Sequence, residues 1–213
     1  MKQTGFLFDL DGVIIDSESE YTKIWSEINR QFPSGKENLA YIIKGQTLTK
    51  ILNDNFPPEK HEEVKSLLHR LENEMRYDYC EGAESFLEAL NERRAPIALV
   101  TSSDEVKMAH LYEEIPGFRQ KIGHIIDASR VKRSKPDPEG YLTAAASLGV
   151  DIRNCVVFED SVQGVMAGRA SGAYVVGIEG TKRREEIEPY ADVVVKSLQE
   201  IDIEELTKLL ENR

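Results

Sequence analysis

The chain of 213 residues is 40% hydrophobic and 31% charged, a composition that indicates an ordinary soluble globular protein and excludes a disordered chain. Its 38 acidic and 27 basic side chains give a net charge of -11, which does not favour binding to nucleic acid or to an anionic membrane. No uncharged apolar segment approaches the ~20 residues of a membrane helix and no signal-peptide pattern is present, so we expect a cytoplasmic protein. Cys80 and Cys155 lack CxxC spacing and are expected to be plain thiols.

The N-terminal third of the chain predicts one strand followed by a helical insertion. GFLF at 5–8 is a continuous apolar run, which is typical of a buried strand. Apolar residues then recur at helical spacing in the segments 21–32, 48–56 and 57–79. Because 17–81 contains no run of the strand type, we predict a helical domain there, with hinges at Asp16–Ser17 and at 79–82.

Strands and helices alternate through the rest of the chain. Apolar runs predict strands at 96–100, 124–126, 155–158, 173–178 and 192–195. Segments of helical character, bounded by Gly, Asp or Pro, lie at 81–94, 104–115, 137–149 and 161–172, and a last helix is predicted at 200–213. Continuous apolar strands are typical of parallel strands covered on both faces. Residues 1–16 and 82–213 therefore predict a doubly wound, Rossmann-like α/β core with a mostly parallel sheet.

Polar side chains follow several of the predicted strands at the point where each strand ends. Asp9 and Asp11 come directly after the first strand, and Gly12 permits a tight turn. The polar groups that follow later strands are Thr101, Ser102 and Ser103, then Lys135 in a Pro-containing loop, then Glu159 and Asp160. Because the carboxyl ends of parallel strands open into one crevice, we expect these side chains to converge there.

The chemistry of these groups indicates a metal and a phosphoryl group. Four carboxylates in one crevice cannot all stay ionised without a cation, and hard oxygen ligands suit Mg²⁺, which shares its coordination sphere with phosphate. A lysine and hydroxyl groups can bind the oxygens of a phosphoryl group during its transfer. One carboxylate can also attack phosphorus and form an aspartyl phosphate.

Each group alone also has a plainer explanation. Acidic pairs in loops are commonly solvated. An EF-hand loop is excluded, because Gly12 lies at the fourth position from Asp9 instead of the sixth. Thr101 could cap the following helix, Lys135 could be a surface charge, and the pair at 159–160 could interact with a helix N-terminus. Their joint occurrence at strand ends favours the catalytic interpretation.

Four motifs, in the right order, resemble those of the haloacid dehalogenase superfamily, in the branch of β-phosphoglucomutase and small sugar phosphatases. FDLDGV is similar to the first motif, VTSS to the second, SKPDPE to the third and FEDSVQG to the fourth. The resemblance spans nearly the whole chain, and ADVVVKSL near the end resembles the last core strand of the family. It implies that 17–81 is a helical cap of the first cap class.

The resemblance also implies a role for each site residue. Asp9 would be the nucleophile, and Asp11 would protonate the leaving oxygen and then activate water. The metal ligands would be Asp9, Asp11 through its backbone carbonyl and Asp160, with Glu159 completing or supporting the metal shell. Thr101 and Lys135 would hold the phosphoryl oxygens, and Ser102 is a candidate substrate contact. The second aspartate and the acidic pair point away from the hydrolysis of carbon–halogen bonds.

Residues of the helical segment bear on the choice between a phosphatase and a phosphomutase. In β-phosphoglucomutases a histidine occupies the position that looks like Tyr21, and an arginine that grips the distal phosphate occupies the position that looks like Leu48. Loss of this anchor favours transfer to water, and hence a Mg²⁺-dependent phosphatase acting on a small monoester such as a sugar phosphate. Lys44 and Gln46 are candidate substrate contacts, with an ordinary surface position as the alternative for Lys44.

Two alternatives to a phosphatase remain at this point: a phosphosugar mutase, and a non-catalytic phosphate-binding or regulatory protein. The latter is disfavoured because the nucleophile, the acid/base, the lysine and the metal acids are all present. The expected partner is a small phosphorylated metabolite, with neither nucleic acid nor membrane, and the chain is expected to be a monomer.

Overall fold

The computed structural model describes residues 3–43, 48–103 and 105–212. The chain divides into two compact units, one formed by Met1–Asp16 with Tyr77–Arg213 and the other by Ser17–Arg76. We call the first the core unit and the second the helical unit.

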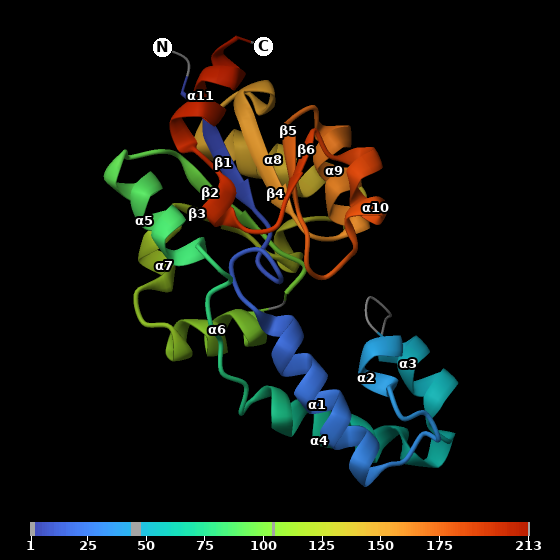
Figure 1. Ribbon diagram of the computed structural model, residues 1–213. Coiled ribbons are helices and arrows are strands. Elements are labelled where there is room, and N and C mark those ends of the chain that lie inside the picture. The colour runs from blue at the N-terminus through green and yellow to red at the C-terminus, as the bar shows by residue number, and fades with distance from the viewer. Residues whose placement is uncertain (1–2, 44–47, 104, 213) are drawn as a thin grey trace. The chain divides into compact units, whose positions relative to one another are not determined.

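The core unit contains a six-stranded sheet in the order β3-β2-β1-β4-β5-β6, in which every neighbouring pair is parallel. The strands are β1 (Gly5–Phe8), β2 (Ile97–Val100), β3 (His124–Ile126), β4 (Cys155–Glu159), β5 (Tyr174–Ile178) and β6 (Val193–Val195). All six coincide with predicted runs to within one residue at each end. The prediction of a doubly wound parallel α/β fold is therefore confirmed (Figure 1).

The central strands are buried on both faces, which explains their continuous apolar sequence. On one face Phe8 stacks on Phe158, with ring centroids 4.6 Å apart, and both rings meet Phe86 edge-on. On the other face Leu7 and Val157 belong to a fully buried cluster with Tyr141. Alternate residues of β1 and β4 thus pack in opposite directions, and neither face carries a polar side chain within the strands before Glu159.

The helices of the core unit cover these faces. They are α5 (Ala83–Glu92), α6 (Glu105–Glu114), α7 (Phe118–Lys121), α8 (Glu139–Leu148), α9 (Val162–Ser171), α10 (Arg184–Ile187) and α11 (Ile203–Glu211). α5 supplies Phe86 to one face, while α8 supplies Tyr141 to the other, and α9 lies beside α8 on that second face (Figure 1). The short helices α7 and α10 were not predicted from the sequence, because four residues are too few to show a helical period.

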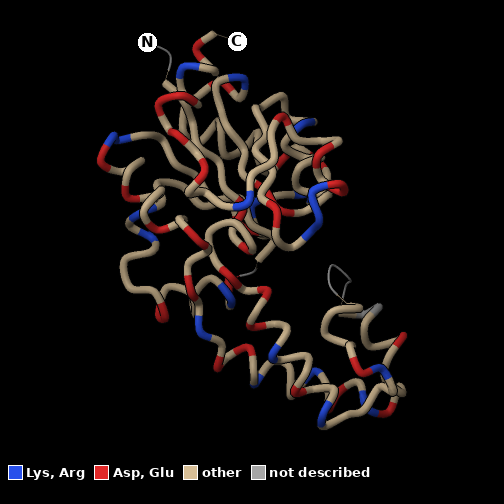
Figure 2. Tube along the Cα trace, viewed as in Figure 1, with Lys and Arg blue, Asp and Glu red and all other residues tan. Residues whose placement is uncertain are grey.

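The helical unit contains four α-helices in its described part: α1 (Ser17–Gln31), α2 (Leu39–Ile42), α3 (Leu48–Asn55) and α4 (His61–Glu72). α1 packs against α4 and buries Trp25 and Ile28, while α4 buries Leu68. Acidic and basic residues are interspersed along α1 and α4 (Figure 2), and some form ion pairs, as Arg30 does with Glu27 at 2.6 Å.

The segment 73–79, predicted as the end of a long helix, is not helical, because its backbone pairs with the chain that leaves β1. The amide of Asp16 donates to the carbonyl of Asp78 at 2.9 Å, and the amide of Cys80 donates to the carbonyl of Ile14 at 2.9 Å. These contacts place residues from Tyr77 onward in the core unit, whereas the predicted boundary lay at Gly82.

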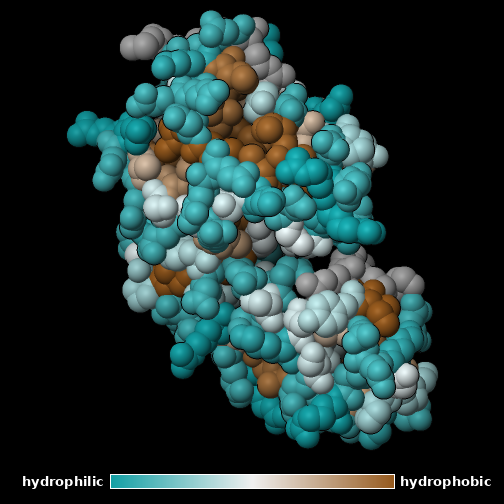
Figure 3. Space-filling model, viewed as in Figure 1, coloured by the Kyte–Doolittle hydropathy of each residue, from teal (hydrophilic) through white to brown (hydrophobic). Residues whose placement is uncertain are grey.

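Most of the surface seen in Figure 3 is hydrophilic, with separate hydrophobic patches. The large hydrophobic side chains that are exposed include Tyr41 and Ile42 on α2 and Val106 on α6. No helix among the described residues combines the length and the apolar character that a membrane crossing requires.

Candidate active site

The site lies where the strand order reverses. β1 is bonded to β2 on one side and to β4 on the other, and the chain visits β2 and β3 before it returns to β4. In doubly wound sheets ligands bind beyond the carboxyl ends of the strands at such a point. The amide of Asp9 donates to the carbonyl of Phe158 at 3.0 Å, so the loops that follow β1 and β4 leave the sheet side by side.

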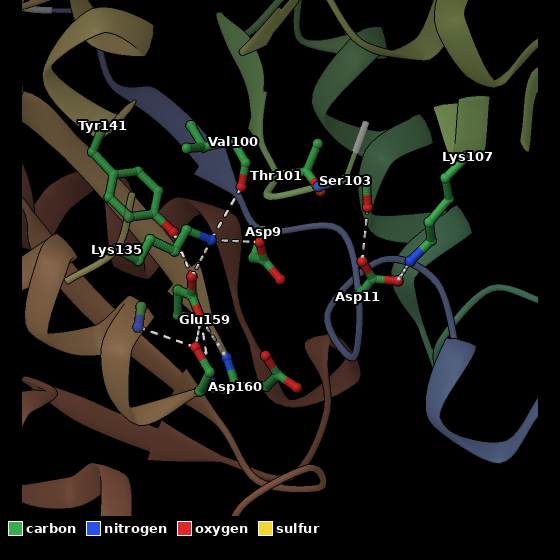
Figure 4. A network of polar contacts seen from close by, with 12 residues as sticks. Asp9, Asp11, Val100, Thr101, Ser103, Lys107, Lys135, Tyr141, Glu159 and Asp160 are labelled. Carbon is green, nitrogen blue, oxygen red and sulfur yellow. Dashed lines mark hydrogen bonds and ion pairs between the residues drawn. The ribbon is translucent and has the colours of Figure 1, made fainter. Parts of the chain in front are cut away.

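Three predicted metal ligands meet at this point. Asp9, Glu159 and Asp160 are all buried, and they each offer a carboxylate oxygen within 4.8 Å of the others (Figure 4). The structure therefore brings together the acid after β1 and the acidic pair at the end of β4, which are separated by 150 residues of sequence.

Lys135 enters this group from the loop that precedes α8. Its Nζ lies 2.5 Å from an oxygen of Asp9 and 2.5 Å from an oxygen of Glu159, and it donates to the carbonyl of Val100 at 3.2 Å. Burial lowers the pKa of Lys135, but the two carboxylates outweigh that effect and the pKa is raised above its ordinary value. Lys135 is thus a buried cation beside the predicted nucleophile.

Glu159 is held by donors on both carboxylate oxygens. Oε1 accepts from Lys135 and from the hydroxyl of Tyr141 at 2.7 Å, while Oε2 accepts from the Ser161 hydroxyl at 3.0 Å and from the amides of residues 160 and 161 at 3.2 Å each. Gly164 leaves the necessary room, because a Cβ there would lie 1.8 Å from the carboxyl carbon of Glu159. These contacts anchor Glu159 and, through it, orient Lys135.

Tyr141 and Ser161 were not predicted as site residues. Tyr141 lies on the apolar face of α8 and reads as a core aromatic, and nothing local to its sequence indicates the contact with Glu159. Ser161 had a local signal, since it follows the acidic pair and is the N-cap of α9, where its side chain accepts from the amide of Gly164.

Burial and the closeness of several carboxylates raise the pKa values of Asp9 and Asp160. Burial raises the pKa of Asp9 from 3.8 to about 7, opposed by Lys135 and reinforced by Glu159 and Asp11. Burial, Glu159 and Asp9 raise the pKa of Asp160 well above its ordinary value. One lysine does not neutralise three neighbouring carboxylates, so this donor set of hard oxygens fits a divalent cation such as Mg²⁺.

The raised pKa of Asp9 predicts that the effect of Mg²⁺ on stability depends on pH. Without metal, the folded protein binds the Asp9 proton more tightly than the unfolded chain, so Asp9 contributes stability at low pH that is lost as pH rises from about 4 to about 7. Above that range the ionised carboxylate is available to a cation. We expect Mg²⁺ to raise the melting temperature more at about pH 8 than at about pH 5.5, as calorimetry or dye-monitored melting can measure. An equal or larger shift at the lower pH would contradict the prediction.

The turn after β1 depends on Gly12. Its φ is +77°, and a Cβ at this position would lie 2.0 Å from Oδ2 of Asp160. Gly12 therefore permits both the left-handed turn and the close approach of the turn to Asp160. Thr181, in the loop after β5, forms a side-chain hydrogen bond with Asp160 that lowers the pKa of that carboxyl. Thr181 was not predicted as a site residue, because it belongs to none of the four motifs.

The hydroxyl cluster after β2 lies beside a cavity of the core unit. Thr101 is buried, and its hydroxyl oxygen accepts from the amide of Ser103 at 3.0 Å. Ser102 is exposed and lines a cavity of about 240 Å³ together with Thr101, Lys135 and Tyr141. Thr101 and Ser102 thus line the same cavity as Lys135.

Asp11 points away from the buried acids (Figure 4). Its Oδ1 lies 2.6 Å from Nζ of Lys107 on α6, and its Oδ2 accepts from the hydroxyl of Ser103 at 3.1 Å. The side chain of Asp11 is 33% exposed to solvent. Asp9 and Asp11, two residues apart, therefore occupy different surroundings.

The helical unit has a cavity of its own. It measures about 240 Å³ and is lined by Glu18, Tyr21, Trp25, Leu48 and Glu72, among others. The hydroxyl of Tyr21 donates to Glu72 at 3.1 Å. The candidates Lys44 and Gln46 lie outside the described residues.

The two cysteines are free. Burial raises the pKa of each thiol to about 12, so neither has the depressed pKa of a nucleophilic thiolate. This agrees with the expectation of plain thiols.

The parallel sheet, with a buried acid cluster and a lysine at its switch point, is that of a doubly wound α/β protein with its functional centre at the strand ends. The model of the haloacid dehalogenase-like hydrolases matches residues 4–172, and the chain belongs to this family. It is a phosphoric monoester hydrolase of that family, in the branch of sugar phosphatases and β-phosphoglucomutase-like proteins.

The similarity to known proteins covers nearly the whole chain. Hexitol phosphatase A of Escherichia coli is 31% identical over 95% of this chain and 95% of its own length. A solved hydrolase of the family from Deinococcus radiodurans, with bound phosphate and sodium, has a TM-score of 0.82 and is 27% identical over 98% of this chain and 97% of its own. β-Phosphoglucomutase from Clostridium difficile has a TM-score of 0.71 and is 25% identical over 99% and 98%.

Proposed function

We propose that this protein is a Mg²⁺-dependent phosphatase that hydrolyses a small sugar or sugar-alcohol monophosphate through an aspartyl-phosphate intermediate. The observation that carries the proposal is the buried carboxylate of Asp9 at the end of β1, in contact with Lys135 and grouped with Glu159 and Asp160. The similarity to a hexitol phosphatase supports the choice of substrate class.

In the first half of the proposed reaction Asp9 attacks phosphorus. A bond forms between its carboxylate oxygen and phosphorus, the bond from phosphorus to the alcohol oxygen breaks, and Asp11 gives that oxygen a proton. Lys135 and Thr101 hold the phosphoryl oxygens, where the buried ammonium stabilises charge that a solvated one would not.

In the second half water replaces the alcohol. Asp11 now takes a proton from the water that attacks phosphorus, and the bond between phosphorus and Asp9 breaks to release inorganic phosphate. Asp9, Asp160 and the backbone carbonyl of Asp11 would hold Mg²⁺, with Glu159 completing or supporting the shell. Bound there, the cation would offset the negative charge of the acids and the phosphoryl group.

The sequence of the helical unit supports hydrolysis over mutase activity. A mutase must hold a bisphosphate at both ends, and Leu48 stands at the position that looks like the arginine with which β-phosphoglucomutases grip the distal phosphate. Without that cation, transfer of the phosphoryl group to water is favoured.

The test is turnover of a panel of esters by the purified protein with Mg²⁺. We expect release of inorganic phosphate in equal amount to alcohol from hexitol and sugar monophosphates, and loss of that release when Mg²⁺ is chelated. The Asp9→Asn protein, prepared in parallel, controls for contaminating phosphatases. Isomerisation of a hexose 1-phosphate without equimolar phosphate release, stimulated by a bisphosphate, would establish the mutase instead. A folded protein that hydrolyses none of the esters would contradict the proposal.

A further inference from the structure

Lys107 belongs to none of the four motifs, yet it contacts the site residue Asp11 from α6. It is the third residue of α6, and its Nζ lies 2.6 Å from Oδ1 of Asp11, while Ser103 donates to Oδ2 at 3.1 Å. The two donors come from the loop after β2 and the first turn of α6, and they grip opposite oxygens of one carboxylate (Figure 4).

The position of Lys107 in its helix does not account for the contact. A cation in the first turn of a helix is disfavoured by the positive end of the helix dipole, where acidic side chains are preferred. Only 19% of the Lys107 side chain is accessible, so it is not an ordinary solvated lysine either. In this place the ammonium forms an ion pair with the carboxylate of Asp11.

The effect on Asp11 is to fix its orientation. A single aspartate can rotate about two side-chain torsions, and the neighbouring acid Asp9 offers it no favourable partner. Held at both oxygens, the carboxylate has one orientation. Because each carboxylate oxygen has a second lone-pair site, Asp11 can still bind one further hydroxyl or water.

We propose that Lys107 is a positioning residue for the acid/base Asp11. The inference rests on the proposed function, in which Asp11 exchanges a proton with the leaving oxygen and with the attacking water. Lys107 keeps the carboxylate at the place where these oxygens arrive, and it acts on the reaction only through Asp11.

The first test is the Lys107→Met variant, which keeps the length of the side chain and removes the charge. We expect kcat for an alkyl phosphate to fall by about tenfold with KM within about twofold, because orientation of an acid/base affects the chemical step. The loss for nitrophenyl phosphate is expected to be smaller, since that leaving group needs no proton. Lys107→Arg, which retains a donor cation, is expected to recover most of the rate.

A double-mutant cycle tests whether Lys107 acts through Asp11. In the Asp11→Asn background, Lys107→Met is expected to cause no further loss in single-turnover rate, because the group that it positions is already gone. Equal losses in both backgrounds, or a Lys107→Met enzyme with wild-type rates on both esters, would overturn the proposal.

The matched control is Lys121→Met. Lys121 also pairs with acids, at 2.7 Å from Glu84 and 3.0 Å from Glu88, but these contacts lie on α5 and α7, outside the acid cluster and the loops after β1, β2 and β4. We expect wild-type kcat in this variant. If the wild-type protein hydrolyses no ester, the proposed function has failed; if it does and Lys107→Met leaves the leaving-group dependence unchanged, only the present inference has failed.

Discussion

Asp9→Asn is expected to abolish hydrolysis of phosphate esters and to leave the protein folded. An amide is a poor nucleophile and a poor metal ligand, and removal of a nucleophile that forms a covalent intermediate lowers kcat by about 10⁴-fold or more. The fold should persist, because neutral asparagine has nearly the shape of the carboxyl and removes one of three crowded negative charges. Phosphate release under single-turnover conditions, with circular dichroism and melting as the check on folding, measures both effects.

Asp16→Asn is the matched control for this experiment. Asp16 belongs to the same segment, but it lies at the boundary with the helical unit, beyond the turn that carries Asp9 and Asp11. We expect substantial activity in this variant. An Asp9→Asn enzyme that retained the wild-type rate would exclude Asp9 as the nucleophile.

Lys135→Met is expected to impair both activity and stability. Loss of a buried cation that contacts the phosphoryl group should lower kcat by about 10²–10³-fold. Breaking a buried ion pair by removing one partner costs about 3–5 kcal/mol, here because Asp9 and Glu159 would face each other without the ammonium between them. Kinetics and urea denaturation without Mg²⁺ measure the two losses.

The loss of stability in Lys135→Met has a predicted pH dependence. Lys135 lowers the pKa of Asp9, so its removal raises that pKa further above about 7. At about pH 5 Asp9 is protonated in the folded wild type and in the folded variant alike, so it adds nothing to the difference between them. At about pH 8 the wild-type carboxylate is ionised beside Lys135, whereas the variant must either keep a proton on Asp9 against the higher pH or bury its charge without a cation. The destabilisation should therefore be greater at the higher pH. Lys196→Met, which removes an exposed lysine just after β6, is the control, and an equal loss of stability in it would contradict the argument.

The sheet and the positions of the acids were predictable because their signals are local. Buried parallel strands appear as unbroken apolar runs, and the first polar residue after such a run marks the carboxyl end of a strand. Asp9 and Glu159 follow from this rule, with Asp160 next to Glu159, together with the meeting of strand ends at a switch point. Lys135 lies in a loop and was predicted from its motif.

The remainder of the site depends on contacts that no short segment contains. Tyr141 looks like a core residue of α8, and its hydroxyl reaches Glu159 only because α8 packs across the sheet. Lys107 looks like a surface lysine in the sequence, and its contact with Asp11 arises only in the folded structure. The end of the helix at Glu72 also had a tertiary cause, since the chain from Asp78 to Cys80 pairs with the residues that follow β1.

The place of β1 between β2 and β4 has a consequence for the newly made chain. Asp9 is synthesised well before β4, so the strand that precedes Asp9 gains its second neighbour only when residues 155–159 have been added to the chain. Glu159 and Asp160 arrive with that same strand. An unfinished chain that ends before β4 therefore has the proposed nucleophile but neither the two later acids nor the closed centre of the sheet, and the pairing of β4 with β1 is the step that completes the proposed active site.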